Sequence, residues 1–425
     1  MNNNKTNWVA VGTMIFLFGM ISFVTNLAAP IGVIWKQAPG IEGSNVWGMM
    51  GNMMNFLAYL FMGIPAGKLI TKVGYKKTTL IGVAVGFCGV LVQFLSGKIG
   101  VGASLAGLPA NFFVYLLGAF ICGFSVCILN TVVNPMLTLL GGGGNRGNQL
   151  VQIGGTFNSL VGTVTPMLVG ALIGSVTAET QIADVNTVLF IAMGVFALTY
   201  LILTFVPFVE PEQETSDATI KGLLKYKHLV YGVIAIFLYV GVEIGIPGTL
   251  NFYLTDTLGT ANAATTAGFV AGTYWFLMLV GRFVSSLISG KVSSRMQLSV
   301  TCAVAIVLVI AAMFSTEVAA SMPVFTGSGF GMAQVPLSAL LLVCCGLCTS
   351  VMWGTIFNLS VEGLGKNAAL ASGLFMTMVV GGGVLPLVQN AIADAVSYMA
   401  SYWVIVAALA YMLWFALFGS KVKKA

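Results

Sequence analysis

Long apolar segments, separated by glycine, proline or charged residues, follow one another along almost the whole chain. A helix needs about 20 mostly apolar residues to cross the hydrocarbon core of a bilayer. The first run is too long for the core of a cleaved signal peptide, so we expect it to remain as a span. The sequence predicts an all-α membrane protein with twelve transmembrane helices, at residues 8–35, 46–69, 78–95, 111–140, 150–175, 185–209, 229–254, 265–288, 298–314, 335–359, 368–392 and 397–418.

One polar stretch, EPEQETSDATIKGLLKYKH at residues 210–228, divides the chain into two parts. We expect it to be a cytoplasmic linker between an N-terminal six-helix bundle, residues 1–209, and a C-terminal six-helix bundle, residues 229–425. A GxxxP motif ends at Pro166 in the fifth predicted helix and recurs at the corresponding place of the second half, at Pro386. Parallel repeats of this kind are typical of transporters that bind their substrate between the two halves near the middle of the membrane.

The composition agrees with the apolar pattern. Of the 425 residues, 58% are hydrophobic and only 7% are charged, whereas soluble domains have about 25% charged residues. A soluble fold is therefore excluded, and the net charge of +6 does not indicate a nucleic-acid partner. All seven cysteines lie in apolar runs, so we expect no disulfide and no metal site.

The positive charges are distributed unevenly between the loops. If the N-terminus is cytoplasmic, the loops on the other side of the membrane contain only Lys36 and Lys98, and Arg282 lies in the inner part of a predicted helix. The remaining lysines and arginines of the 18 then all fall on the cytoplasmic side. This asymmetry predicts that both termini are cytoplasmic and that the number of spans is even.

Glu243 is the one acidic residue that falls in the middle of a predicted helix. A carboxylate at the centre of a bilayer costs at least about 2.5 kcal/mol, so Glu243 should face water or a partner, where it can take up and release a proton. This favours a role in coupling transport to an ion gradient. The alternative is a permanently protonated, structural Glu243. Tyr239 and Asn251 lie on the same helical face.

Neutral amides form stripes on two other predicted helices. Asn130, Asn134 and Thr138 share one face, and so do Asn52, Asn55 and Tyr59. Sugar hydroxyls both donate and accept hydrogen bonds, and neutral side chains satisfy them without burying a charge. The alternative is that the amides make hydrogen bonds between helices. Further candidates for contact with a substrate are Asn26, Gln152, Asn158, Gln389 and Asn390.

Two tryptophans lie well inside predicted helices rather than at their ends. Trp275 and Trp353 could each present an indole face to the C–H face of a pyranose ring. Ordinary packing in the protein interior is the competing interpretation.

This chain lacks the residues that several other classes of membrane protein require. The single histidine, His228, lies in the linker, which excludes Ser/His dyads and HExxH metalloproteases, and we therefore do not expect an enzyme. The glycine run that begins at Gly141 lacks the GK[ST] ending of a P-loop, so the chain does not bind ATP in that way. The sequence does not exclude a channel, nor a sugar sensor that binds without transporting.

Several segments resemble a known family. FMGIPAGKLITKVGYKK, residues 61–77, resembles the loop between the second and third helices of the major facilitator superfamily, and the Gly281-Arg282 pair resembles its weaker copy in the second half. TVVNPMLTLLG at 131–141 and IFNLSVEGLGKNAALASGLFMTMVVGGGVLPLVQNAIADA at 356–395 resemble the fucose, galactose and glucose symporters of that superfamily, and the glucose/galactose branch is the more similar. The resemblance implies the twelve-helix fold in two pseudo-symmetric bundles, and it implies a gating role for Gly67, Lys72, Gly74, Lys76, Lys77 and Arg282.

The chain departs from the fucose-type members of that family. Those proteins carry a carboxylate in the first helix and another just before the TxxNP motif, and both are credited with proton coupling. Here the second position is Asn130, and residues 8–35 contain no acid. The glucose/galactose relatives have an amide before TxxNP, to which Asn130 is similar. This resemblance implies that the substrate is a neutral hexose.

Together, these features predict a transporter of the bacterial inner membrane that imports a glucose- or galactose-like sugar by alternating access, coupled to protons through Glu243. The alternatives are sodium-coupled or uncoupled transport of a related sugar, such as fucose or an N-acetylhexosamine, and a sugar sensor. We expect no cofactor and no obligatory protein partner.

Overall fold

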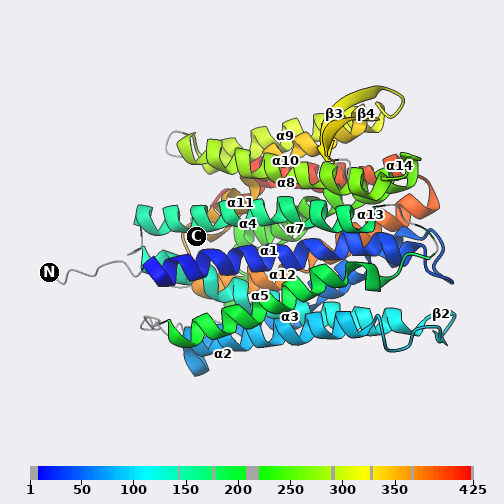
Figure 1. Ribbon diagram of the computed structural model, residues 1–425. Coiled ribbons are helices and arrows are strands. Elements are labelled where there is room, and N and C mark those ends of the chain that lie inside the picture. The colour runs from blue at the N-terminus through cyan, green and yellow to red at the C-terminus, as the bar shows by residue number, and fades with distance from the viewer. Residues whose placement is uncertain are drawn as a thin grey trace.

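The structure is a computed structural model, and it describes residues 8–141, 144–174, 177, 179–206, 220–288, 292–325, 329–364 and 368–422. Long helices run side by side along one axis (Figure 1). The start of α1, Trp8–Lys36, and the end of the described chain lie towards one end of the bundle, which we call the terminal end. Two β-hairpins lie at the opposite end, which we call the hairpin end.

The helices follow the predicted order in both halves. In the described part of the first half they are α1, α2 (Asn45–Leu95), α3 (Ala110–Leu140), α4 (Gly144–Ile173), a 3₁₀ turn (Ile182–Val185) and α5 (Asn186–Phe205). In the described part of the second half they are the short α6 (Ile220–Leu223), α7 (Lys227–Thr257), α8 (Ala263–Ile288), α9 (Ser294–Met313), α10 (Leu337–Thr349), α11 (Met352–Val361), α12 (Ala368–Met378), α13 (Gly381–Ala395) and α14 (Tyr398–Trp414), which ends in a π turn (Phe415–Gly419).

Helix α2 contains two membrane spans. It is 51 residues long, which corresponds to about 77 Å at 1.5 Å per residue, more than twice the ~30 Å of a hydrocarbon core. Its helical conformation is interrupted at Gly74, where φ is 85° and ψ is 169°. Glycine adopts positive φ without a steric penalty, so the chain can reverse there. The two halves of α2 match the second and third predicted helices.

Two other spans are each built from two consecutive helices. The tenth consists of α10 and α11, and the eleventh consists of α12 and α13. The described residues contain eleven helical stretches that are long and apolar enough to cross a membrane, and α2 accounts for two spans. The prediction of an all-α fold with twelve transmembrane helices is therefore confirmed.

Two short hairpins connect helices at the hairpin end, and the sequence pattern did not predict them. The larger one pairs β3, Ala319–Phe325, with β4, Phe330–Pro336, in an antiparallel register that places Ala319 opposite Pro336. The smaller one pairs β1, Ser104–Leu105, with β2, Leu108–Pro109. The smaller hairpin lies in a segment that the apolar pattern assigned to a loop, and the larger one does so except for the last two residues of β4, which fall at the start of the helix predicted at 335–359.

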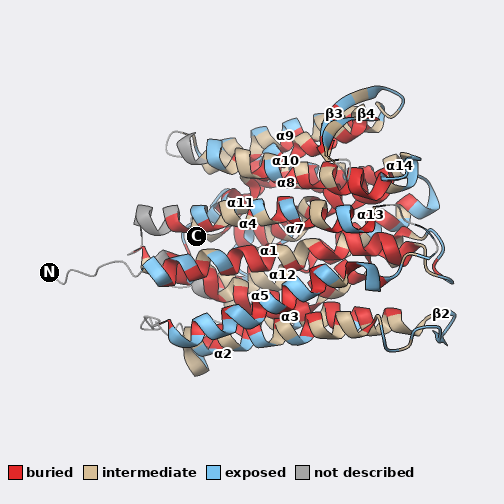
Figure 2. Ribbon diagram, viewed as in Figure 1, coloured by how far each residue is buried: buried red, intermediate tan, exposed pale blue. Residues whose placement is uncertain are grey.

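Burial distinguishes the interior of the bundle from its outside. Buried and exposed residues alternate along many helices, as expected for helices with one face towards the interior and one towards the outside (Figure 2). The exposed side chains include large apolar ones such as Phe205, at 83% exposure, and Phe314, at 79%. Soluble monomers rarely leave wide apolar surfaces in water, so this outer surface suits contact with lipid.

The two halves meet along helices α1, α2 and α4 on one side and α7, α8, α12 and α13 on the other. Small residues allow the closest approach, between α4 and α8. A Cβ atom added to Gly268 would lie 2.4 Å from the carbonyl oxygen of Pro166, and one added to Gly170 would lie 2.6 Å from that of Ala264. Such contacts between small residues are typical of helices that pack tightly in membranes.

Candidate functional site

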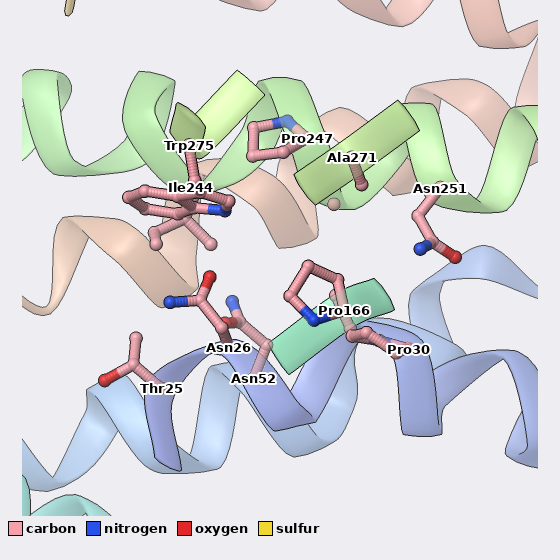
Figure 3. A pocket seen from close by; sticks show the side chains of 12 residues that line it. Thr25, Asn26, Pro30, Asn52, Pro166, Ile244, Pro247, Asn251, Ala271 and Trp275 are labelled. Atoms are coloured by element: carbon pink, nitrogen blue, oxygen red, sulfur yellow. The ribbon is translucent and has the colours of Figure 1, made fainter. Parts of the chain in front are cut away.

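A cavity lies between helices of the two halves (Figure 3). The cavity has a volume of about 20 Å³, which is room for about one water. The cavity must widen before it can hold a larger ligand. It is lined by Thr25, Asn26, Ala29 and Pro30 of α1, Asn52 of α2, Pro166 of α4, Ile244, Pro247, Gly248 and Asn251 of α7, and Ala271 and Trp275 of α8.

Three asparagines supply hydrogen-bonding groups from both halves. Asn26 donates to the carbonyl and hydroxyl oxygens of Ser22, at 2.9 and 3.2 Å. Asn52 donates to the carbonyl oxygen of Gly382, at 2.8 Å. The amide of Asn251 is 97% buried, since its exposure is 3%, and it makes no hydrogen bond within the described part of the chain. The cavity wall therefore contains an unused amide donor and acceptor, and it contains no ionised side chain.

Prolines explain why polar backbone groups are available here. Pro30, Pro166 and Pro247 line the cavity from three different helices. A proline within a helix lacks the N–H that would bond to the carbonyl four residues earlier. Pro386 of α13 frees the Gly382 carbonyl in the same way, and this is the oxygen that accepts the Asn52 amide. Irregular backbone of this kind is tolerated in membranes where it lines a cavity or is satisfied by other groups.

The two candidate tryptophans lie in different places. Trp275 lines the cavity opposite Asn26, beside Ile244 (Figure 3). Its ring meets that of Tyr274 edge-on, with centroids 5.6 Å apart. Trp353 of α11 does not line this cavity and instead meets the ring of Tyr239, with centroids 6.2 Å apart. Of the two tryptophans, only Trp275 can contact a ligand in the cavity as the structure stands.

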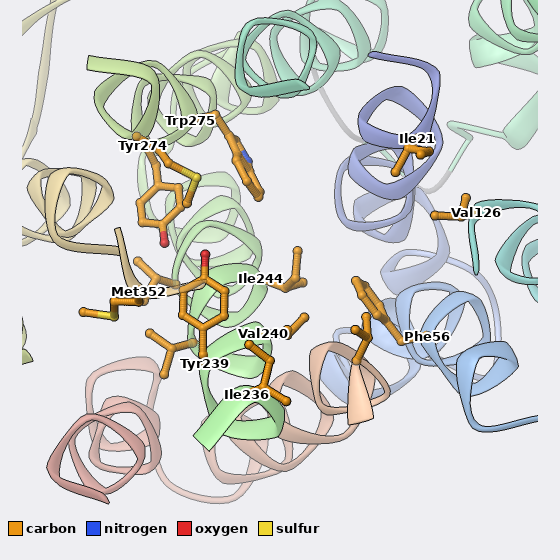
Figure 4. Close-up of a cluster of buried hydrophobic side chains, with 14 of the residues drawn as sticks. Ile21, Phe56, Val126, Ile236, Tyr239, Val240, Ile244, Tyr274, Trp275 and Met352 are labelled. Carbon is orange, nitrogen blue, oxygen red and sulfur yellow. The ribbon is translucent and has the colours of Figure 1, made fainter. Parts of the chain in front are cut away.

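Glu243 lies on the terminal side of the cavity, next to Ile244. Its carboxylate accepts a hydrogen bond of 2.8 Å from the Tyr239 hydroxyl. The Arg282 guanidinium lies 3.7 Å from the same oxygen, and the two side chains are 14% and 16% exposed. The hydroxyls of Tyr239 and Tyr274 point towards each other (Figure 4). The carboxylate in the middle part of α7 therefore has a cation and a phenol as neighbours.

Arg282 also bridges the two halves. From α8 it donates to the carbonyl oxygen of Gly155 at 2.7 Å and to the hydroxyl of Ser159 at 2.8 Å, both on α4. Arg282 lies within α8, as the sequence predicted, beside Glu243. The gating role that the resemblance implies stays a prediction. One planar guanidinium can hold several acceptors at fixed angles, which suits a residue that contacts both halves.

Three of the remaining candidate amides make hydrogen bonds within the first half. Asn130 donates to the Tyr59 hydroxyl at 2.8 Å, and Asn134 donates to the Asn130 carbonyl at 3.3 Å. Asn158 donates to the Phe18 carbonyl at 2.9 Å. The contacts of Asn130 and Asn158 match the alternative in which the amides join helices, whereas the Asn134 contact lies within α3. The side chains of Gln152 and Thr138 lie outside the described residues.

The other candidate amides are buried away from the cavity. Asn390 donates to the Thr249 hydroxyl, at 3.0 Å, between α13 and α7. Gln389 is fully buried, and neither atom of its amide has a partner among the described residues. Asn55 is 4% exposed, and a Cβ atom added to Gly123 of α3 would lie 2.0 Å from its carbonyl oxygen.

The candidate gating loop lies at the break in α2. Gly74 supplies the positive φ, and Lys76 donates to the carbonyl oxygens of Thr204 and Val206, at 3.0 and 2.9 Å, at the end of α5. A cation is favourable at a helix C-terminus, where carbonyl groups lack partners. Lys72 and Lys77 are exposed, and a Cβ atom added to Gly67 would meet open space.

Comparison with known proteins identifies the family. The model of the Major Facilitator Superfamily matches residues 11–385. The chain belongs to this superfamily. It is thus a multi-pass membrane transporter rather than an enzyme, as the sequence segments at 61–77 and 356–395 predicted.

The relatives cover nearly the whole chain. A glucose/galactose transporter of Brucella abortus is 28% identical, and the alignment covers 99% of this chain and 96% of that protein. The L-fucose-proton symporter of Escherichia coli is 23% identical, over 80% of this chain and 77% of its own. The crystal structure of the fucose:proton symporter of E. coli superposes with a TM-score of 0.68 at 19% identity, covering 98% of this chain and 100% of that one. A superfamily transporter solved in the outward conformation gives a TM-score of 0.66 at 20% identity.

Proposed function

We propose that this transporter carries a neutral hexose across the bacterial inner membrane by alternating access. The observation that supports this most directly is the cavity between the halves, whose wall combines three amides and an indole with no ionised group. Amides match hydroxyls that both donate and accept, and an indole face matches the C–H face of a pyranose. The names of the glucose/galactose and fucose relatives point to the same class of substrate.

Within this proposal, Asn26, Asn52, Asn251 and Trp275 contact the sugar. Their places on the cavity wall support this role. Asn130 and Asn134 act on the site through the packing of α2 and α3, because Asn130 is bonded to Tyr59. Occupancy requires the halves to move apart locally, since the cavity is narrow.

We further propose that protons drive the transport and that Glu243 carries the coupling proton. The carboxylate lies beside the cavity, and its neighbours are Tyr239 and Arg282. When Glu243 takes up a proton, the attraction to Arg282 is lost, and Arg282 is then held only by α4. Protonation thereby changes a contact that joins the two halves. Sodium coupling or uncoupled transport of the same or a related sugar is the alternative.

The proposal includes an orientation and a division of the chain. The terminal end faces the cytoplasm, because nearly all lysines and arginines lie in segments that reach that end. The hairpin end then faces outside. Residues 1–209 and 229–425 form the two bundles that move against each other, and residues 210–228 link them.

Uptake by the purified protein in proteoliposomes tests this function. Labelled glucose, galactose, fucose and N-acetylglucosamine should be compared under a proton gradient, under a sodium gradient and without a gradient. We expect saturable uptake of glucose or galactose, with accumulation above the outside concentration only under the proton gradient. Uptake that fails to saturate would indicate a channel, and binding without any uptake would indicate a sensor.

A further inference from the structure

Five polar residues from both halves meet at the hairpin end, above the central cavity. They are Lys36, Asn45, Asp256, Asp394 and Tyr398, which we call the outer cluster. Lys36 is the last residue of α1, yet its side chain is only 1% exposed and its Nζ lies 2.7 Å from the Asp256 carboxylate. The sequence pattern placed Lys36 in a loop on this side; the structure instead buries it between the halves.

The Tyr398 hydroxyl connects the members of the cluster. It accepts a hydrogen bond of 2.9 Å from Lys36 and lies 2.7 Å from the side-chain oxygen of Asn45. It also contacts the Asp256 carboxylate. Lys36 and Asn45 belong to the first half, and Asp256 and Tyr398 belong to the second. One hydroxyl therefore contacts polar groups of both halves.

Asp394 makes a second connection between the halves. Its carboxylate accepts hydrogen bonds from the backbone N–H groups of Asn45 and Val46, at 2.8 and 3.1 Å, and from the Ser44 hydroxyl at 2.9 Å. The first N–H groups of a helix have no partner within it, and this end of the helix favours a negative charge. A residue of the second half thus caps the start of α2 in the first half.

The cluster separates two hollows. The central cavity reaches Pro30 of α1 and Asn251 of α7. A second hollow of about 410 Å³ at the hairpin end is lined by Gln37 of α1 and by Thr255 and Asp256 of α7, among others. Lys36 lies six positions beyond Pro30, which is about 9 Å along a helix. On α1, Lys36 therefore lies between the two hollows, and on α7 its partner Asp256 forms part of the wall of the second hollow.

The stem of Lys36 is held by close packing. A Cβ atom added to Gly48 would lie 2.6 Å from Cγ of Lys36, and the Lys36 ammonium lies 4.9 Å from the ring centroid of the buried Phe252. An ammonium over an aromatic face is stabilised by the ring. The lysine thus passes from α1 over α2 to reach α7 and α14.

We propose that the outer cluster is the closure of the outer side of the transport path, and that it must come apart whenever the cavity opens to the outside. Separation exposes the buried Lys36 ammonium to water, whereas Asp256 and Asp394 are already exposed and lose only their partners in the other half. The start of α2 keeps a cap when Asp394 leaves, because the Ser44 hydroxyl also accepts from the Trp47 N–H, at 3.4 Å. These properties suit a contact that forms and breaks in every cycle.

The test measures how fast a thiol in the cavity reacts from each side. Ala29 lines the cavity, and Ala29→Cys is treated with a membrane-impermeant maleimide in right-side-out and inside-out vesicles, with mass spectrometry following position 29 alone. The variants Lys36→Ala, Asp394→Asn and Tyr398→Phe are compared with Lys98→Ala, a lysine at the same end that contacts Phe94 of its own half. We expect labelling from the outside to become at least tenfold faster in Lys36→Ala and severalfold faster in the other two cluster variants, with no change in Lys98→Ala.

Each outcome decides for or against the closure. If Lys36→Ala is not monodisperse after purification, Tyr398→Phe and Asp394→Asn still provide the test, because they keep the size of the side chain. Unchanged outside labelling in the folded cluster variants, or an equal increase in Lys98→Ala, would overturn the proposal. Faster labelling from the inside-out vesicles only would contradict the proposed orientation, while the role of the cluster at the hairpin end would stand.

Discussion

The Glu243 carboxylate and the Arg282 guanidinium lie 3.7 Å apart beside the central cavity, and Arg282 holds its shorter contacts to the opposite half of the protein. A charge change on Glu243 therefore acts on a residue that joins the halves. Removing one partner of a buried ion pair leaves the other uncompensated, which costs several kcal/mol. In the proposed mechanism, this relationship links protonation of Glu243 to the packing of the two halves.

Replacement of Arg282 should disrupt that link. In Arg282→Gln we expect gradient-driven uptake to fall at least tenfold. In Arg282→Lys we expect a smaller loss, because the ammonium keeps the positive charge beside Glu243 but cannot hold Gly155, Ser159 and Glu243 together. Ser159→Ala is the matched control: it removes one contact to α4 and should reduce uptake only slightly. Initial rates in proteoliposomes measure this effect, and wild-type uptake by Arg282→Gln would argue against a role of the bridge in transport.

Asn251 should contribute directly to sugar affinity. Its amide lines the cavity without a partner among the described residues, and one hydrogen bond is worth about 0.5 to 1.5 kcal/mol. Asn251→Ala should therefore weaken binding about two- to twelve-fold, measured by calorimetry. Asn158→Ala, which removes a hydrogen bond to Phe18 between α4 and α1, should lower thermal stability and leave affinity nearly unchanged. If Asn158→Ala weakened binding and Asn251→Ala left it unchanged, the sugar would contact Asn158 rather than Asn251.

The two inner tryptophans should respond differently to the sugar. Trp275 lines the cavity and Trp353 packs against Tyr239, so binding should change the emission of Trp275. We expect the sugar-induced fluorescence change to survive in Trp353→Phe and to be largely lost in Trp275→Phe. A signal that is unaffected by Trp275→Phe would exclude an indole contact with the sugar.

Close packing of α13 against α7 should depend on Gly381. A Cβ atom added there would lie 1.9 Å from the carbonyl oxygen of Phe237, so the two backbones would have to separate. Gly381→Ala should lower the stability by about 1 to 3 kcal/mol, seen as a lower melting temperature. Gly373→Ala on α12 is the control, since a Cβ atom there meets nothing within 4 Å; it should be neutral or slightly stabilising. Equal melting temperatures in the two variants would contradict the tight contact.

Much of the fold can be predicted from the sequence because helices that cross lipid require long apolar segments, which are easily recognised. Each span needs a long apolar run, so twelve helices could be placed, and an acid such as Glu243 stands out within them. The breaks that divide the tenth and eleventh spans, and the β3–β4 hairpin, were missed. These features arise from local backbone geometry and tertiary contacts, which an average over apolar residues does not resolve.

Contacts between residues that lie far apart in the sequence could not be predicted from it. Spacing along a helix shows that Asn130 and Asn134 share a face, but it does not reveal that Asn130 meets Tyr59 of α2. In the same way, loop charges assign Lys36 to one side of the membrane without showing that Asp256 and Tyr398 enclose it. Such pairs form only when helices from separate parts of the chain come together.

The most direct test of proton coupling compares Glu243→Gln with wild type in two transport modes. Counterflow exchanges bound sugar and needs no net proton movement, whereas accumulation needs a carboxyl that loads a proton on one side and releases it on the other. Glu243→Gln keeps the size of the side chain and loses the titrating group. We expect it to retain counterflow and to lose accumulation under a proton gradient. Accumulation equal to wild type in Glu243→Gln would contradict the central claim and place the coupling elsewhere.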